Sequence, residues 1–187
     1  SYSVQNERIN IFCEKAVIES AKDKQIAQET FNELLEFARN SGIKKDEYLS
    51  KIATALVEAE EVDTALKVID EIEDDFEIVR ALCTIAYKQF KKGEKVTTID
   101  AAIKAKNQIQ DEKKHLQALN FIAQIQVFAG KGEQAVRTID SKLPDRNLHI
   151  SGIASLFIQT GDKVNFKKLL VPCAYYSDAS YRMCGYL

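Results

Sequence analysis

A short pattern of hydrophobic residues recurs four times along the chain. It reads hydrophobic-x-x-Ile-Ala and stands at 49–53, 82–86, 119–123 and 150–154, at spacings of 33, 37 and 31 residues. Another apolar residue follows each alanine after four positions. These steps place the apolar positions on one face of an α-helix. Each copy therefore predicts one amphipathic helix.

A turn residue follows each copy at a fixed distance. Seven positions after the alanine the chain reaches Glu60, Gly93, Gly130 or Gly161. Glycine adopts positive φ at little cost and commonly follows the last residue of a helix. Beyond each turn, apolar or small residues recur at steps of three and four, which predicts a second helix. They are Ala65, Ile69 and Ile72, then Thr98, Ala102 and Ala105, then Ala135 and Ile139, then Phe166, Leu170 and Cys173.

Each unit is thus a predicted helical hairpin, and the fold class is all-α. A single hairpin leaves apolar surface uncovered, so we expect the units to stack as a solenoid of about four and a half hairpins. About nine helices and no sheet should result, and a compact helical bundle is the alternative. Small side chains let neighbouring helices approach closely. Four alanines should therefore be nearly inaccessible: Ala53, Ala86, Ala123 and Ala154.

The pattern also predicts where the units begin and end within one continuous domain. Residues 1–45 form a degenerate capping hairpin, whose first helix keeps apolar residues at the equivalent places. These are Ile9, Phe12, Cys13 and Val17. The later units cover residues 46–78, 79–115, 116–146 and 147–177, followed by a truncated fifth unit at 178–187. We expect the parent protein to continue beyond Leu187, because the sequence stops within a predicted helix.

The spacing of the packing positions resembles that of the tetratricopeptide repeat, over about residues 46–187. In that family a Trp-x-x-Leu-Gly-x-x-Tyr helix is followed by a second helix with Ala, Phe, Ala and a closing Pro. The matching positions of one unit are Leu49, Ile52, Ala53, Ala65, Ile69 and Ile72. The resemblance implies a right-handed superhelix, in which the first helix of each hairpin lines a concave groove that holds peptides or partner proteins.

The same resemblance implies which side chains face that groove. Tyr87 and Phe128 would anchor a partner side chain, and Asn120 and Gln124 would offer amide groups to a bound backbone. Packing between neighbouring helices is the other explanation for the two aromatic residues. The full set of candidate partner-binding residues is Thr54, Arg80, Tyr87, Lys91, Asn120, Gln124, Phe128 and Ser155.

Composition narrows the function further. Lys and Arg number 26 against 28 Asp and Glu, so the basic excess that drives nucleic-acid binding is missing. A basic cluster at Lys88, Lys91, Lys92 and Lys95 raises the RNA-reading pentatricopeptide repeat as an alternative, although a solvated helix end explains it more simply. No stretch has the roughly 18 to 20 apolar residues of a membrane helix. We therefore expect no nucleic-acid partner and no membrane contact.

Catalytic and metal-binding patterns are missing from the sequence. His115 and His149 have no metal-ligand spacing, and four scattered cysteines form neither a disulfide framework nor a CxxC site. Free cysteines at packing positions behave as small hydrophobic residues and fit a reducing cytosol. We predict no catalytic residues, metal or cofactor, and a cytoplasmic location.

Charge is distributed unevenly between neighbouring units. Residues 46–79 carry twelve acidic and two basic residues, whereas residues 80–115 carry four acidic and nine basic ones. Oppositely charged neighbours attract each other, and the surface they form is either a solvated exterior or a dipolar surface for a partner.

These observations favour a non-enzymatic adaptor or scaffold that binds a protein or peptide. The alternatives are a chaperone that holds an unfolded client and a regulatory repeat region of a larger enzyme.

Overall fold

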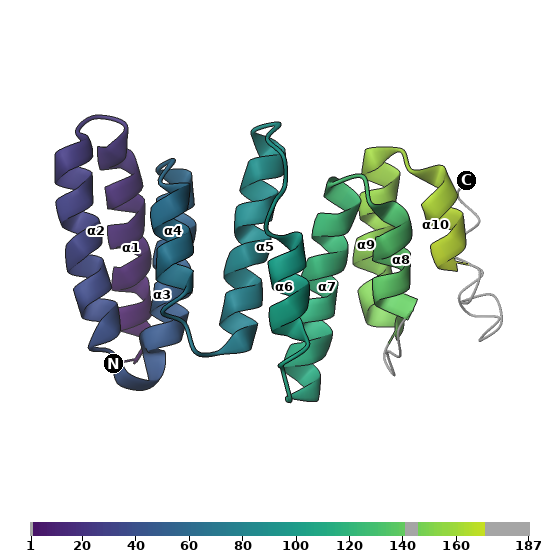
Figure 1. Cartoon of the computed structure of the whole chain (residues 1–187), viewed down its shortest axis with the longest axis horizontal. Helices are drawn as coiled ribbons and strands as arrows, with labels where there is room; N and C mark the ends of the chain where they lie inside the picture. Colours follow the sequence, from purple (N-terminus) through teal and green to yellow (C-terminus); the bar gives the residue numbers. More distant parts are fainter. Residues whose placement is uncertain (1, 141–145, 171–187) are drawn as a thin grey trace. The chain divides into compact units, whose positions relative to one another are not determined.

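The computed structural model describes residues 2–140 and 146–170, and all regular structure in these ranges is helical (Figure 1). It comprises ten α-helices, one more than expected, and a short 3₁₀ helix at Gly42–Lys44, without a strand in the described ranges. The helices are α1 (Tyr2–Ser20), α2 (Lys24–Arg39), α3 (Lys45–Glu58), α4 (Val62–Ile69), α5 (Asp75–Lys91), α6 (Ile99–Lys106), α7 (Glu112–Phe128), α8 (Gly132–Asp140), α9 (Arg146–Thr160) and α10 (Lys163–Leu170). The all-α prediction is confirmed for this part of the chain.

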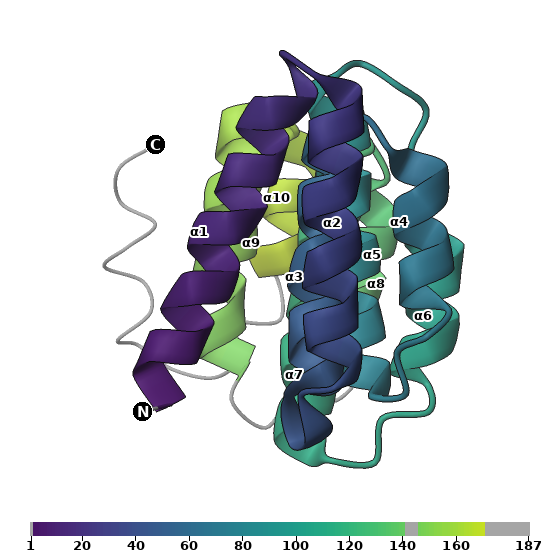
Figure 2. The ribbon, with the colours of Figure 1, turned by 90° about the vertical axis from the view of Figure 1, so that its left-hand side faces the viewer.

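The chain folds as two compact units, residues 1–115 and 116–187. In the first unit α1 packs on α2, α3 on α4, and α5 on α6, which gives three helical hairpins in succession (Figure 1). Figure 2 shows the first pair, α1 and α2, side by side. The first helices of the hairpins also touch, because α3 contacts both α1 and α5. This packing is consistent with a helical repeat.

The recurring hydrophobic pattern forms the core of the first unit. Leu49, Ile52 and Ala53 of α3 are fully buried, as is Ala86 of α5. Ala65 of α4 is equally inaccessible. Alanine at the helix contact permits close packing, while the larger neighbouring side chains fill the remaining space.

The four predicted turns share one backbone geometry. Glu60, Gly93, Gly130 and Gly161 have φ values of 68°, 72°, 71° and 72°. In each turn the following residue donates its N–H to a carbonyl five positions earlier, as Glu61 does to Leu56 at 2.8 Å. This is the hydrogen bond of the Schellman motif, which ends a helix with one residue in the left-handed region. The turn prediction is therefore confirmed, even where glutamate replaces glycine.

The longer spacing of 37 residues has a local cause. Helix α4 begins at Val62, two residues after Glu60, whereas α6 begins at Ile99, six residues after Gly93. Gln89 holds the extra loop, because its side chain accepts a hydrogen bond from Thr97 N at 3.1 Å and donates one to Thr97 Oγ1 at 3.2 Å. The insertion lengthens the loop and leaves the helices in register.

The second unit has its own core, built from α7, α8, α9 and α10. Its buried residues are Ala123, Val127, Ala135, Val136, Ile139, Ile153, Phe157 and Leu169. Thr138 of α8 donates a hydrogen bond to Gln126 Oε1 of α7 at 2.8 Å. Phe157 is fully buried at the place that Leu56 takes in α3, so the repeat position keeps its role.

The apolar register of the sequence does not match the observed burial at every position, and Ile158, four positions after Ala154, is 61% exposed. Ala154 is only partly buried, because Ile153 and Phe157 provide the contacts of α9 with the core. Phe12 is 38% exposed, since α1 turns Ile9, Cys13 and Ala16 inward instead. The predicted unit at 178–187, with Cys184, and the proposed packing role of Cys173 lie outside the described residues, as does the side chain of His149.

Candidate partner-binding groove

An open pocket of about 330 Å³ lies between the first helices of three successive hairpins in the first unit. It is lined from α1, α3 and α5. The lining residues are Asn10, Cys13, Glu14, Val17, Ser50, Lys51, Thr54, Ala55, Glu58, Arg80 and Thr84. The volume lies at the lower end of the range typical of ligand pockets, roughly 300–1,000 Å³. It is large enough for one or two side chains of a partner.

Two of the predicted groove residues line this pocket. Thr54 lies on α3, four residues after Ser50, and Arg80 lies on α5, four residues before Thr84. Both neighbours also line the pocket. Thr54 Oγ1 donates to the Ser50 carbonyl at 3.1 Å, and Thr84 Oγ1 donates to the Arg80 carbonyl at 2.9 Å. Both threonine hydroxyl hydrogens are therefore directed to a carbonyl of their own helix.

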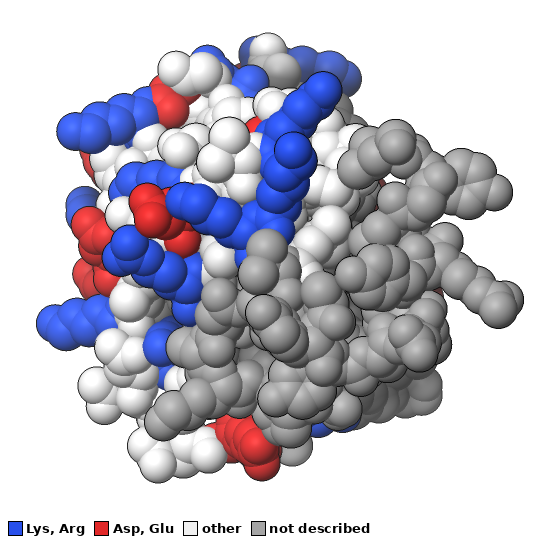
Figure 3. Space-filling view, turned by 90° about the vertical axis from the view of Figure 1, so that its right-hand side faces the viewer, with Lys and Arg blue, Asp and Glu red and all other residues white. Residues whose placement is uncertain are grey.

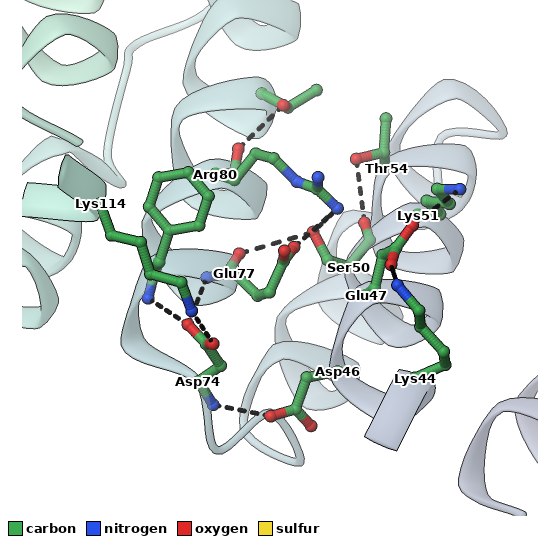
Figure 4. A network of polar contacts seen from close by, with 12 residues as sticks. Lys44, Asp46, Glu47, Ser50, Lys51, Thr54, Asp74, Glu77, Arg80 and Lys114 are labelled. Atoms are coloured by element: carbon green, nitrogen blue, oxygen red, sulfur yellow. Dashed lines mark hydrogen bonds and ion pairs between the residues drawn. The ribbon is translucent and has the colours of Figure 1, made fainter. Parts of the chain in front are cut away.

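Arg80 is held by a carboxylate of its own helix (Figure 4). Its Nη2 lies 2.6 Å from Glu77 Oε2 and 3.5 Å from Ser50 Oγ of α3. Burial raises the pKa of Glu77 above its ordinary value, and the positive charge of Arg80 offsets only part of this effect. The contact of 2.6 Å nevertheless shows that the guanidinium already has a carboxylate partner.

Lys51 also has a carboxylate partner on its own helix, which it shares with Lys44. Glu47 lies one turn earlier on α3 and pairs with both Lys51, at 3.4 Å, and Lys44 (Figure 4). Burial by itself raises the pKa of Glu47, but the two ammonium groups outweigh it and lower that pKa below its ordinary value. Glu47 therefore stays charged at neutral pH and forms an ion pair with Lys51.

A second polar cluster fixes the start of α5 beside α3. Asp74 caps α5 by accepting the N–H groups of Phe76 and Glu77, at 2.9 and 3.3 Å, and Lys114 Nζ lies 2.6 Å from its Oδ2. Asp46 of α3 accepts the Asp74 N–H at 2.7 Å (Figure 4). Burial raises the pKa of Asp74, yet Lys114 and the capping bonds lower it on balance. This cluster positions the helix and is not part of the pocket lining.

The other predicted residues of the first unit lie outside the pocket lining. Tyr87 is half-buried on α5, and Lys91 Nζ lies 5.6 Å from the centre of its ring. The structure brings these two side chains together, and neither is among the residues that line the pocket.

Four predicted residues belong to the second unit. Asn120 and Gln124 of α7 are joined by a hydrogen bond of 3.2 Å between their side-chain amides. Phe128, at the end of α7, is half-buried, and Ser155 of α9 is exposed. Asn120, Gln124 and Phe128 follow one another at steps of four and so share a helix face.

Basic residues stand on the surface of the second unit. Figure 3 shows Lys and Arg side chains on the described part of this face. Exposed examples on α8 and α10 are Arg137, Lys163, Lys167 and Lys168. Glu133 lies 3.2 Å from Arg137 and 3.7 Å from Lys168, so part of this charge is compensated.

The sequence did not indicate five polar lining residues or the apolar Ala55; the polar ones are Asn10, Glu14, Lys51, Glu58 and Thr84. Asn10 and Glu14 stand on the capping hairpin, which matches the repeat pattern least well. The available signal was their spacing of four residues beside buried Cys13, which places them on one polar edge of α1.

Thiol and histidine chemistry gains no support from the described residues. Burial raises the pKa of Cys13 to about 11 and that of Cys83 to about 12, so both remain protonated at neutral pH. His115 is half-buried next to Lys114. Within the described ranges, no group of three His, Cys, Asp or Glu residues is placed to hold a metal ion. None of the described helices is long and apolar enough to cross a membrane.

Comparison with known proteins gives no match, whether with family models, curated sequences or solved structures. Assignment of a function therefore depends on the pocket and on the sequence pattern.

Proposed function

We propose that this chain is a cytoplasmic, non-enzymatic adaptor that binds a peptide segment of a partner protein. The pocket between α1, α3 and α5 supports this proposal most strongly, because three successive hairpins contribute side chains to one depression. The tetratricopeptide-like spacing adds to it, since a right-handed array of such hairpins would present the same helices on its concave side. Thr54 and Arg80 would contact the peptide directly.

The other predicted residues belong to the same proposal. Tyr87 and Lys91 would contact the partner further along α5. Asn120, Gln124, Phe128 and Ser155 would do so on the second unit. An extended peptide can contact several repeats at once, and aromatic anchors commonly contribute most to the affinity.

Filling the pocket tests the proposal. A phage-displayed library of random nonapeptides is selected on the wild-type chain, and the affinity of a selected peptide is measured by fluorescence anisotropy. Thr54→Trp should weaken binding at least about tenfold, because the indole would occupy the space of the peptide. Thr64→Trp is the matched control, since Thr64 is also half-buried but lies on α4, outside the pocket.

Stability, affinity and the result of the selection together decide whether the pocket is the binding site. Urea denaturation must show that both tryptophan variants fold with similar stability. Equal affinity for Thr54→Trp and wild type would place the binding site elsewhere, and Tyr87→Ala and Phe128→Ala would then locate it. Failure to select any peptide would contradict the proposal.

A further inference from the structure

The charged side chains that line the pocket differ in whether they already form ion pairs. Its two cations are both engaged, Arg80 by Glu77 at 2.6 Å and Lys51 by Glu47 at 3.4 Å. These carboxylates stand on the same helices as the cations, one turn away or less. An acidic ligand would have to compete with them at the cost of a like-charge repulsion.

The two acids of the lining differ, because only one of them has an ion-pair partner. Glu58 pairs with Lys88 of α5 at 2.5 Å, and Lys88 lies outside the lining. Glu14 of α1 makes no hydrogen bond or ion pair within the part of the chain that the structure describes, and its side chain is exposed. Glu14 is therefore the one charged residue of the lining without an ion-pair partner in the described ranges.

The floor of the pocket suits an aliphatic stem. Cys13, Val17 and Ala55 contribute apolar surface next to Glu14. Burial keeps the Cys13 thiol protonated and uncharged at neutral pH. Lysine and arginine commonly bury their methylene groups along such a surface while the charged end contacts a polar group.

The net charge of the first unit also favours a basic ligand. Residues 1–115 contain 23 acidic and 18 basic residues. A net negative unit attracts cationic segments over distances of about a Debye length, roughly 8–10 Å at physiological salt. This field would favour the approach of a basic peptide.

We propose that the pocket recognises a lysine or arginine side chain of the partner peptide, with the cation at the Glu14 carboxylate and its stem on Val17 and Ala55. The inference rests on the proposed peptide-binding function and names the chemistry that the pocket selects. Asn10 stands one turn before Glu14 on α1, and its amide oxygen offers a second acceptor for the same cation.

The nonapeptide library tests this inference directly. Lysine and arginine should be enriched over aspartate and glutamate among the selected peptides. One selected peptide and its Lys→Gln or Arg→Gln counterpart are then compared on the wild type, on Glu14→Gln and on Glu14→Asp. Replacing the basic residue should weaken binding to the wild type at least about fivefold. Glu14→Gln should bind the basic peptide more weakly than the wild type does, by a similar factor. On this variant, replacing the basic residue of the peptide with glutamine should have little further effect on the affinity.

Two controls make the result specific to this pocket. Glu33→Gln removes an equal charge from an exposed position on α2 and should leave the affinity unchanged. Raising NaCl from about 50 mM to about 500 mM should weaken the wild-type complex more than that of Glu14→Gln, because salt screens the lost ion pair. Glu14→Asp should retain part of the preference for the basic peptide.

The outcomes separate the two proposals. If peptides are selected without basic enrichment, or if Glu14→Gln and Glu33→Gln behave alike, the basic specificity is wrong and the peptide-binding function stands. If Thr54→Trp binds the selected peptides as tightly as wild type does, the pocket is not their site and both proposals fail. If no peptide is selected, both fail as well.

Discussion

Lys92 Nζ lies 3.1 Å from Glu60 Oε1, and the two residues belong to equivalent turns of neighbouring hairpins. Lys92 immediately precedes Gly93, the residue that occupies the place of Glu60 in the next unit. Lys88 and Glu58 make a parallel contact at 2.5 Å, one turn away. The acidic block at 46–79 and the basic residues at 80–115 therefore meet in register. The predicted attraction between these units has a structural basis, although each exposed pair stabilises the fold by less than about 1 kcal/mol.

Replacing Glu60 with glycine should stabilise the first unit by roughly 0.5 kcal/mol. Glu60 has φ of 68°, where a side chain costs about 1 kcal/mol relative to glycine. Relief of this strain should exceed the loss of the exposed pair with Lys92. The urea unfolding midpoint measures the change.

Glu60→Ala provides the comparison, because it removes the ion pair and keeps the strained backbone. It should be less stable than wild type. If Glu60→Gly were less stable than Glu60→Ala, the left-handed turn would not be the reason for glycine at the equivalent positions.

Ala123→Phe should destabilise the second unit by roughly 1–3 kcal/mol. Ala123 is fully buried among Val127, Ile139 and Ile153, so a larger side chain overpacks the core. Ala154→Phe is the contrasting change. Ala154 is only partly buried, so the phenylalanine ring could extend into solvent. This substitution should cost clearly less. Equal losses for the two variants, measured by chemical denaturation, would contradict the difference in burial between Ala123 and Ala154.

Local features of the repeat were predictable from the sequence, and features that depend on neighbouring units were not. The turn at Glu60 was identified by register alone, because three glycines occupy the same place in other units. Ala154 shows the limit of that reasoning. Whether a position is covered depends on the neighbouring helices, and the pattern within one helix does not contain this information.

The candidate site shows the same limit. Thr54 and Arg80 were predicted through the tetratricopeptide resemblance, and both line the pocket. Glu14 was missed as a lining residue, because its place in the pocket depends on α1 packing against α3, a contact between residues far apart in sequence. The pairing of Arg80 with Glu77 was also hidden, since a spacing of three residues is as common on solvated helix faces as in binding sites.

Cys13 and Cys83 should resist thiol reagents in the folded protein. Burial raises the pKa of both thiols, to about 11 and about 12, so little reactive thiolate forms at pH 8. In a Cys173→Ser/Cys184→Ser background, reaction with a chromogenic disulfide should be slow and should accelerate sharply in urea. Rapid reaction of both thiols under native conditions would mean that the interfaces around α1 and α5 open readily.

Glu77 and Glu47 should respond oppositely to the same substitution. The pKa of Glu77 is raised by burial, so its charged form disfavours the folded state. Glu77→Gln should therefore be slightly more stable than wild type at pH 7, by less than about 1 kcal/mol. The pKa of Glu47 is lowered on balance by Lys44 and Lys51, despite burial, so its charge supports folding at neutral pH. Glu47→Gln should be less stable by a similar amount.

The pH dependence separates these effects from a simple loss of packing. The contribution of Glu47 is present above its unfolded pKa, about 4.3, and is lost as the pH falls through its lower folded value. The cost of Glu77 is present at neutral pH and disappears as the pH falls below both of its values. Both differences from wild type should therefore shrink between pH 7 and pH 3 in urea titrations, with Glu33→Gln as the exposed control. A Glu77→Gln variant that is destabilised equally at both pH values would show that its carboxylate contributes packing and hydrogen bonding, and that its charge has no net effect on folding.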